Sequence, residues 1–548
     1  MKVQGNLLLA QALRRHGVDS LFYLMGGPTL GAATACIEAG IRMVDTRHEQ
    51  AAAMMAHAYA RLRSKPGVCM AASGPGAINL TTGLANALVD CSPIVAIGGS
   101  SPISQYGTGS FQEFDQVAVM KPVTKWAARV HDARRIPEFV DRAFQQAMEG
   151  KPGPVYLDLP GDILYQEVEA DQIAWADISD MGRTARPAAS EGALDRLLEL
   201  LSEARRPVLL TGSGIFWSGA SQELRDVVEL SGIPFYTTPQ GRGAVPDDHH
   251  RSYLHARSTA LREADLVVVL GTRLSYVWNY CAPPRFNPAS KVVRVDISPE
   301  EIGNTPRLAL GICADVGTVL SQLSKRLEGR NLHEMFSDWR KQLQAEAERK
   351  SAKQEVEIAT DQIPIHPLRL CKEVREVLSR DAILVVDGQE ILNYGRQTIQ
   401  TFEPAHRLNS GPFGTMGVGL PFGVGAKAAC PDKTVVVLHG DGSFGFNAME
   451  LDTAVRHKLP LLVVISLNGG WTGDPEKEKP GRNLGYTRFD ELARALGCYA
   501  EQVETPDAIG PALRRGLDAV SSGQVALINV VTDWRARATT ASFTNYST

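Results

Sequence analysis

The chain has 548 residues, of which 44% are hydrophobic and 22% charged, and its formal net charge is −4. This length suggests about three or four domains, and the nearly balanced charge provides no basic surface for nucleic acid or an anionic membrane. No apolar run reaches the roughly 18 residues that span a bilayer, and the first residues lack the apolar core of a signal peptide, so we expect a cytoplasmic protein.

Residues 1–165 alternate apolar strands with amphipathic helices. Strands are expected at 21–25, 41–45, 67–72, 93–98 and 154–159, with helices such as 6–16 and 50–63 between them. This alternation predicts a doubly wound parallel sheet, the first of three α/β domains. The Gly-Gly-Ser-Ser stretch at 98–101 is interpreted as a polar, kinked loop.

Two polar groups in this first domain are candidates for chemistry. Glu49 follows a strand and begins a helix rich in Ala and Met, a position where a carboxylate usually complements the helix dipole. Phe111 and Gln112 lie in a polar cluster at 109–116, which is by itself as well explained by a surface loop. The residues alone therefore leave a structural role open for both groups.

A polar stretch at about 165–190 is expected to link this domain to a second α/β domain at 190–330. Its strands are expected at 207–211, 233–237, 265–270 and 291–297. Arg273 ends one strand and could meet a diphosphate. Asp296 ends another, where it could contact a ribose hydroxyl or cap the next helix, and both interpretations stay open. Residues 331–362 form a charged helix and linker, to which we assign no function.

The last domain, 363–548, contains a strand-helix-strand unit with a polar residue after each strand. Two β-branched runs, at 435–438 and 461–467, flank a helix at 447–457. Asp441 and Asn468 follow these runs and should face one crevice, because parallel strands end at the same edge of a sheet. Their oxygen atoms are suited to a Mg²⁺ ion that also holds phosphate.

Glycines in this domain would let a ligand approach the backbone closely. Gly440 and Gly442 flank Asp441 and leave room for a diphosphate at backbone N–H groups. A strand at 382–386 leads into Gly388 and Gln389 at the same crevice, and the glycine-rich stretch 411–421 could press on a flat ring.

The stretch Gly440-Asp441-Gly442-Ser443, with Asn468 placed 27 residues after Asp441, resembles the metal-diphosphate motif of thiamine diphosphate (ThDP) enzymes. The resemblance implies three doubly wound domains: a pyrimidine-binding domain at 1–165, a central nucleotide- or coenzyme A-binding domain at 190–330, and a diphosphate-binding domain at 363–548. It also implies Mg²⁺, with Asp441, the Asn468 side chain and the Gly470 carbonyl as ligands. One departure is Leu467, where the family usually has a second Asn.

The same resemblance implies roles for the other candidates. Glu49 would hydrogen-bond the aminopyrimidine ring and promote loss of the thiazolium C2 proton, while Phe111 and Gln112 would line the substrate side of the cofactor. Met416 would hold the cofactor in its bent conformation. The implied cofactor contacts are Gly388, Gln389, Gly414, Met416, Gly440, Gly442, Ser443 and Asn468.

Within the family, the chain is most similar to 2-hydroxyacyl-CoA lyases and next to oxalyl-CoA decarboxylases. The matching stretches are 98–101, 111–114, 283–285, 295–297, 408–419 and 443–446. The resemblance implies cleavage of a 2-hydroxyacyl-CoA, for example 2-hydroxyisobutyryl-CoA, into formyl-CoA and an aldehyde or ketone. Alternatives are an oxalyl-CoA decarboxylase, an acetohydroxyacid synthase and a non-catalytic nucleotide-binding regulator. The segment 471–479 departs from the family pattern where the acyl group should be selected.

The resemblance also implies partners. Candidate ligands of coenzyme A or a bound nucleotide such as ADP are Arg273, Asp296, Ile297 and Arg407. Glu49 and Asp441 lie in different domains, and in this family such residues meet across a subunit interface, so we expect a homodimer or homotetramer. The tail at 534–546 is either a frayed terminus or a lid over coenzyme A.

Overall fold

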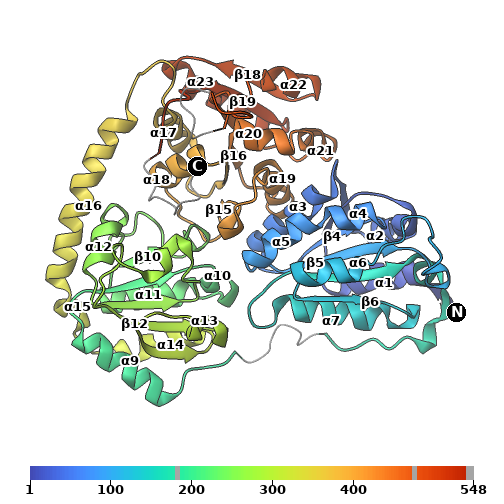
Figure 1. The fold of residues 1–548 in the computed structure, drawn as a ribbon, viewed down its shortest axis with the longest axis horizontal. Helices are drawn as coiled ribbons and strands as arrows, with labels where there is room; N and C mark the ends of the chain where they lie inside the picture. The colour runs from blue at the N-terminus through green and yellow to red at the C-terminus, as the bar shows by residue number, and fades with distance from the viewer. Residues whose placement is uncertain (179–185, 472–477, 539–548) are drawn as a thin grey trace.

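A computed structural model describes residues 1–178, 186–471 and 478–538 and contains three parallel sheets, each flanked by helices (Figure 1). The three sheets span residues 20–160, 207–313 and 383–531. Their strands are rich in Val, Ile and Leu because each central strand is covered on both faces. This arrangement confirms the expected fold class. Within the described part of the chain, no helix is long and apolar enough to cross a membrane.

The N-terminal sheet has the strand order β3-β2-β4-β5-β7-β6. A short antiparallel pair, β1 (Lys2–Gln4) with β8 (Glu167–Glu169), lies beside it. Its strands are β2 (Ser20–Tyr23), β3 (Arg42–Asp45), β4 (Gly67–Ala71), β5 (Ile94–Ser100), β6 (Trp126–Arg129) and β7 (Val155–Pro160). Its helices are α1 (Gly5–Arg15), α2 (Leu30–Glu38), α3 (Glu49–Arg63), α4 (Pro75–Asn79), α5 (Thr81–Val89), α6 (Gln116–Met120), α7 (Ile136–Met148) and α8 (Gly161–Tyr165).

The central sheet has the order β10-β9-β11-β12-β13. Its strands are β9 (Pro207–Thr211), β10 (Phe235–Thr237), β11 (Leu266–Leu270), β12 (Lys291–Asp296) and β13 (Leu308–Cys313). Its helices are α9 (Glu191–Glu203), α10 (Gly214–Ser218), α11 (Ser221–Ser231), α12 (Arg257–Glu263), α13 (Pro299–Gly303) and α14 (Val316–Leu327). The short α15 (Leu332–Met335) and the long α16 (Ser337–Ile358) then run along the outer edge toward the last domain, as the charged segment predicted (Figure 1).

The C-terminal sheet has the order β15-β14-β16-β17-β19-β18. Its strands are β14 (Ile383–Asp387), β15 (Arg407–Leu408), β16 (Val435–Gly440), β17 (Leu462–Leu467), β18 (Tyr499–Val503) and β19 (Ala526–Val531). Its helices are α17 (Pro367–Val377), α18 (Glu390–Thr398), α19 (Gly419–Ala429), α20 (Asp441–Phe446), α21 (Glu450–Arg456), α22 (Phe489–Ala495) and α23 (Pro506–Ser521). The strand order reverses between β14 and β16, and such a switch point is where open parallel sheets bind ligands.

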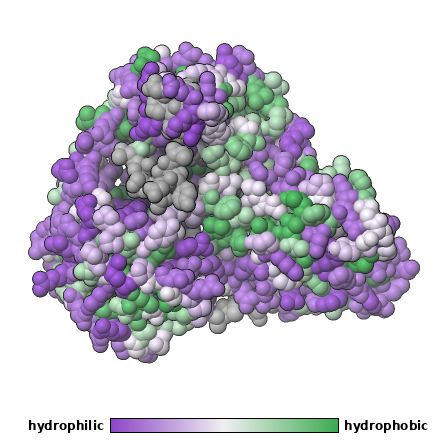
Figure 2. All heavy atoms as spheres, viewed as in Figure 1, coloured by the Kyte–Doolittle hydropathy of each residue, from purple (hydrophilic) through white to green (hydrophobic). Residues whose placement is uncertain are grey.

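The N-terminal and C-terminal domains share one hydrophobic core, in which α3 packs against α19. Small residues allow this close approach, since a Cβ atom on Gly425 would lie 2.3 Å from the Met55 carbonyl oxygen. Figure 2 shows apolar surface on the viewed face where these two domains adjoin.

The interpretation of 98–101 as a loop is wrong for its first three residues, because β5 continues to Ser100 and all three are buried. Glycine is needed at 98 since a Cβ atom there would lie 2.0 Å from the Tyr156 hydroxyl oxygen. The strand therefore carries small residues where neighbouring groups leave no space, rather than where the chain turns.

Candidate active site

The residues predicted to hold a metal ion lie together at the ends of β16 and β17. The Asp441 carboxylate is buried, with Oδ1 accepting the Gly442 N–H at 2.8 Å and Oδ2 accepting the Gly469 N–H at 2.7 Å. The Asn468 side-chain oxygen accepts the Gly470 N–H at 3.2 Å. Burial raises the pKa of Asp441 to about 6. A divalent cation fits this set of oxygen donors, because it would compensate a carboxylate that burial otherwise penalises.

Space beside this turn is restricted by one aromatic ring. A Cβ atom on Gly442 would lie 2.6 Å from the Trp471 ring, so the indole packs directly on the turn. The Ser443 hydroxyl donates to the Gly440 carbonyl at 3.0 Å, and its oxygen lies 3.1 Å from Nδ1 of His439. Because the hydroxyl already has these partners, a diphosphate would be expected to meet the backbone of Ser443 rather than its side chain.

A cavity of about 1900 Å³ lies where the three domains meet. Gly388, Gln389, Gly414 and Met416, which were predicted to contact a cofactor, all line it. Gly388 sits at the end of β14, beside Gly440 at the end of β16, since a Cβ atom on Gly388 would lie 3.2 Å from the Gly440 nitrogen. The cavity is therefore adjacent to the turn predicted to bind a metal ion, although the candidates on that turn, Gly440–Ser443, and those after β17, Asn468 and Gly470, do not line it among the described residues.

Three arginines that were not predicted as ligands, Arg257, Arg285 and Arg396, also line this cavity. Among the described residues, none of them has a carboxylate partner. The Arg257 guanidinium stacks 4.5 Å over the Trp278 ring, and its buried Nε and Nη2 atoms have no hydrogen-bond partner. Burial, with Arg285 and Arg396 nearby, lowers the pKa of Arg257 to about 9. Such a cluster is suited to an anion with several oxygen atoms.

Only one of these three arginines lies in a stretch that carried a signal in the sequence. Arg285 follows the Pro283-Pro284 pair in a stretch that matched the family, whereas Arg257 begins α12 and Arg396 lies inside α18 without a surrounding motif. Arg407, which was predicted to bind a nucleotide or coenzyme A, does not line the cavity. Arg407 belongs to β15, and its buried side chain donates to the Ile399 carbonyl at 3.0 Å.

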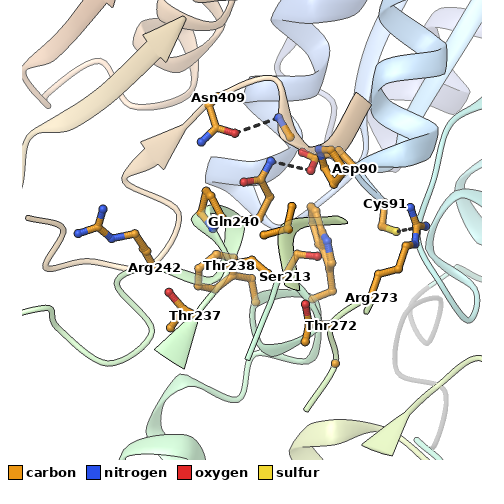
Figure 3. A pocket seen from close by; sticks show the side chains of 18 of the residues that line it. Asp90, Cys91, Ser213, Thr237, Thr238, Gln240, Arg242, Thr272, Arg273 and Asn409 are labelled. Atoms are coloured by element: carbon orange, nitrogen blue, oxygen red, sulfur yellow. Dashed lines mark hydrogen bonds between the residues drawn. The ribbon is translucent and has the colours of Figure 1, made fainter. Parts of the chain in front are cut away.

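The predicted central-domain ligands Arg273, Asp296 and Ile297 also line this cavity, and Figure 3 shows Arg273 beside Cys91. Arg273 is engaged by the protein itself, with Nε 3.2 Å from Glu301 and Nη1 donating to the Val89 carbonyl at 3.3 Å. Asp296 accepts the Ser298 N–H at 3.0 Å, which favours its interpretation as a residue that stabilises the turn before α13. Ile297 lines the cavity beside it.

The N-terminal candidates form a separate group. The Glu49 carboxylate is buried and accepts a hydrogen bond from Asn79 at 2.9 Å. Gln112 has a left-handed backbone (φ 58°), and its side-chain oxygen accepts from the Ser73 hydroxyl at 2.7 Å. The Phe111 side chain is 86% exposed. None of Glu49, Phe111 and Gln112 lines the cavity in the described part of the chain.

The chain was compared with known proteins. Models of the thiamine pyrophosphate enzyme match its N-terminal TPP-binding domain at residues 3–119, its central domain at 194–323 and its C-terminal TPP-binding domain at 392–530. A 2-hydroxyacyl-CoA lyase of Arabidopsis thaliana is 34% identical over 97% of this chain and 96% of its own length. An acetolactate synthase large subunit of Mycobacterium tuberculosis is 35% identical over 96% and 95%. The oxalyl-CoA decarboxylase of Escherichia coli strain K12 is 31% identical over 96% and 95%.

Proposed function

The chain belongs to the thiamine pyrophosphate enzyme family, and from that premise we propose that it cleaves 2-hydroxyacyl-CoA thioesters into formyl-CoA and an aldehyde or ketone. The C1–C2 bond breaks, the hydroxyl proton is released as the new carbonyl forms, and a proton is added to the formyl carbon, so no oxidant or reductant is consumed. Thiamine pyrophosphate (ThDP) would supply the electron sink for this cleavage when bound. A branched 2-hydroxyacyl group, as in 2-hydroxyisobutyryl-CoA, is one candidate substrate.

The cluster of Arg257, Arg285 and Arg396 is the observation that carries this proposal. Coenzyme A has several phosphate groups, whereas a 2-oxoacid has one carboxylate. Two buried guanidinium nitrogens of Arg257 without a protein partner would be costly unless an anion completes their hydrogen bonds. The cluster shares its cavity with Gly388, Gln389 and Met416, so a long thioester could reach from the arginines toward the cofactor site.

The roles of the remaining residues follow from their positions. Asp441, Asn468 and the Gly470 carbonyl would hold Mg²⁺, and Gly440 and Gly442 would leave the backbone accessible to the diphosphate. Glu49 would hold a proton between its carboxyl and the pyrimidine ring, and Gln112 would orient the substrate carbonyl.

A second subunit would complete the site. Among the described residues, neither Glu49 nor Asp441 lines the cavity, and exposed apolar side chains, among them Phe111, Phe114, Phe446 and Met449, provide surface for association. We therefore include a homodimer, or a tetramer built from two dimers, in which Glu49 of one chain faces the diphosphate site of the other.

The test is product analysis with purified protein loaded with ThDP and Mg²⁺. Incubation with a series of 2-hydroxyacyl-CoAs should give formyl-CoA and the matching carbonyl product by mass spectrometry, and Glu49→Gln should give neither. If none of the series yields formyl-CoA, the lyase proposal is wrong.

The same experiment distinguishes two alternatives. The acetolactate synthase relative supports a test with pyruvate, in which 2-acetolactate would be the product. The oxalyl-CoA decarboxylase relative supports a test with oxalyl-CoA, in which carbon dioxide would be released.

A further inference from the structure

The turn that precedes Glu49 is held by a helix from the C-terminal domain. This turn, residues 45–48, connects β3 to α3, and α21 packs against it (Figure 1). We call the α21 residues that contact it, together with the residue that follows the helix, the α21 clasp. The clasp consists of Glu450, Asp452, Thr453, Arg456 and His457.

Glu450 is the buried centre of the clasp. Its side chain is almost inaccessible, and its two oxygens accept the backbone N–H of Arg47 at 3.1 and 3.3 Å. The backbone N–H of His48 is also directed at this carboxylate. The Thr453 hydroxyl donates to Oε2 at 2.6 Å and so fixes the carboxylate orientation. Glu450 thus binds main-chain groups directly before the first residue of α3, where a negative charge also complements the helix dipole.

The other clasp residues bind the outer side of the same turn. Arg456 donates to both the side chain and the backbone carbonyl of Asp45, at 2.5 and 2.9 Å. His457 lies 2.7 Å from the Asp45 carboxylate, and Asp452 accepts from Arg47 at 2.6 Å. These partners are more exposed than Glu450, so solvent weakens their contribution.

The Glu49 side chain itself has few restraints. Among the described residues, its only hydrogen bond is with Asn79. Its position therefore depends largely on where the first turn of α3 begins, and a shift of about 1 Å in a reacting group can reduce a rate about a hundredfold.

We propose that Glu450 is a positioning residue for Glu49, acting through the backbone of residues 47 and 48. This inference rests on the proposed role of Glu49 in activating ThDP, but it is independent of which acyl-CoA is cleaved. Glu450 touches neither substrate nor cofactor and acts through the start of α3.

The first measurement uses the protein without ThDP. In Glu450→Ala, amide hydrogen exchange of peptides covering residues 45–52 should rise at least tenfold, while peptides of the central domain keep their wild-type rates. Thr453→Val, which removes only the hydroxyl that orients the carboxylate, should give a smaller rise in the same peptides.

The second measurement uses the loaded protein without substrate. The rate of hydrogen–deuterium exchange at C2 of bound ThDP should fall at least tenfold in Glu450→Ala, with ThDP affinity changed less than threefold. Glu450→Gln, which keeps one acceptor oxygen, should lie between this variant and wild type. This readout requires no acyl-CoA, so it separates failure of this inference from failure of the lyase proposal.

A matched control is Asp490→Asn. Asp490 is a similarly buried carboxylate of the same domain, but its partners are Arg488 and Arg494. The Asp490→Asn variant should leave the amide exchange rate at residues 45–52 and the C2 exchange rate of ThDP within twofold of wild type. The positioning role would be overturned if the folded variants Glu450→Ala and Glu450→Gln both kept a C2 exchange rate within threefold of wild type. It would also be overturned if amide exchange rose over the whole C-terminal domain rather than at residues 45–52.

Discussion

At the scale of single residues, the arginines that line the cavity differ in whether their side chains are paired within the protein. Arg273 is engaged by Glu301, whereas Arg257 stacks on Trp278 and leaves two buried nitrogens unpaired. Arg407 also has two buried nitrogens without a partner but lies outside the cavity, so it is the position of Arg257 in the cavity, together with its unpaired nitrogens, that marks it as a candidate ligand. The arginine cluster is therefore the part of the cavity where substitutions should affect substrate binding most.

Arg257→Met tests this directly. Methionine keeps an apolar side chain over Trp278 but removes the charge, and the loss of a hydrogen bond to a charged group costs about 1.5–3 kcal/mol, or roughly 10- to 100-fold in affinity. We expect KM for the acyl-CoA to rise by about that factor in steady-state assays. Arg380→Met is the matched control, because Arg380 also stacks on a ring but pairs with Asp248 outside the cavity. An unchanged KM in Arg257→Met would contradict the anion site.

Glu49→Gln should separate cofactor activation from cofactor binding. The amide retains the size of the side chain and the contact with Asn79, but it cannot exchange a proton with the pyrimidine ring. We expect turnover to fall about 10²- to 10⁴-fold, the usual contribution of acid–base catalysis. Titration with ThDP, followed by intrinsic fluorescence, should show affinity within a few-fold of wild type. Turnover within tenfold of wild type would exclude the assigned role.

At the scale of elements, the C-terminal sheet places its site at the point where strand order reverses. The ends of β14 and β16 contact each other through glycines, and Trp471 covers the turn that begins α20. Because Gly388 and Trp471 both pack closely on the turn, its backbone is the surface that we expect a diphosphate to meet.

Gly442→Ala should disturb this turn sterically. The added methyl group would lie 2.6 Å from Trp471, and overpacking of this kind typically costs about 1–3 kcal/mol. We expect ThDP affinity, measured by calorimetry with saturating Mg²⁺, to fall at least fivefold and to recover partly in Gly442→Ala/Trp471→Ala. Gly445→Ala lies in the same helix with open space at its Cβ position and should bind like wild type. Equal affinities for Gly442→Ala and Gly445→Ala would show that the turn has space to spare.

The contact between α21 and α3 should also depend on pH. Burial raises the pKa of Glu450 from 4.5 to about 7, so the folded state binds this proton more tightly than the unfolded chain. Ionised Glu450 then lowers stability progressively as pH rises from about 4.5 to about 7, by roughly 3 kcal/mol in total.

Since glutamine does not titrate, the difference in Tm between Glu450→Gln and wild type should shift in favour of the variant between pH 5 and pH 8, measured by scanning calorimetry. Asp490→Asn supplies the opposite case. Arg488 lowers the pKa of Asp490 to about 2, so this carboxylate stays ionised between pH 5 and pH 8. The difference in Tm between Asp490→Asn and wild type should therefore stay constant in this range. A constant difference for Glu450→Gln as well would contradict the raised pKa.

At the scale of the whole molecule, one chain separates the proposed activating residue from the proposed cofactor cavity. Glu49 and Asp441 belong to domains that share a core, and among the described residues neither lines the cavity, whereas Gly388 and Gln389, beside the Asp441 turn, do. A second copy of the chain is the simplest source of the missing half-site.

Complementation between two inactive chains tests this arrangement. Glu49→Gln and Asp441→Asn should each be inactive alone, but mixed dimers contain one site with both Glu49 and Asp441 intact. Random mixing by co-expression should restore about a quarter of the wild-type rate, since half of the dimers would carry one intact site of two. The absence of any recovery, with mixed dimers demonstrated by native mass spectrometry, would place both residues of each site on one chain.

Periodic burial and local motifs were sufficient to predict the fold class and to place Asp441 and Asn468 at neighbouring strand ends. Apolar runs predicted most of the inner strands, because such strands are covered on both faces. The edge strands β6, β13, β15 and β18 were not predicted, since an edge strand has one neighbour and can be short or polar. The inner strand β19 was also not predicted, although it is an apolar run. Asp441 and Asn468 could be placed together because each follows one of two adjacent parallel strands. The ends of such strands meet at one edge of the sheet, so a single strand-helix-strand unit is enough to predict their proximity.

The sequence by itself thus determined the fold class and the family that the chain resembles, because those properties depend on short-range patterns. Only the tertiary structure decided which charges lack a partner and which distant residues meet. Arg257, Arg285 and Arg396 are far apart in the chain, Glu450 reaches a turn 403 residues away, and Arg407 is buried outside the cavity. Such contacts depend on how whole domains pack against each other, and the local pattern of apolar residues does not predict that packing.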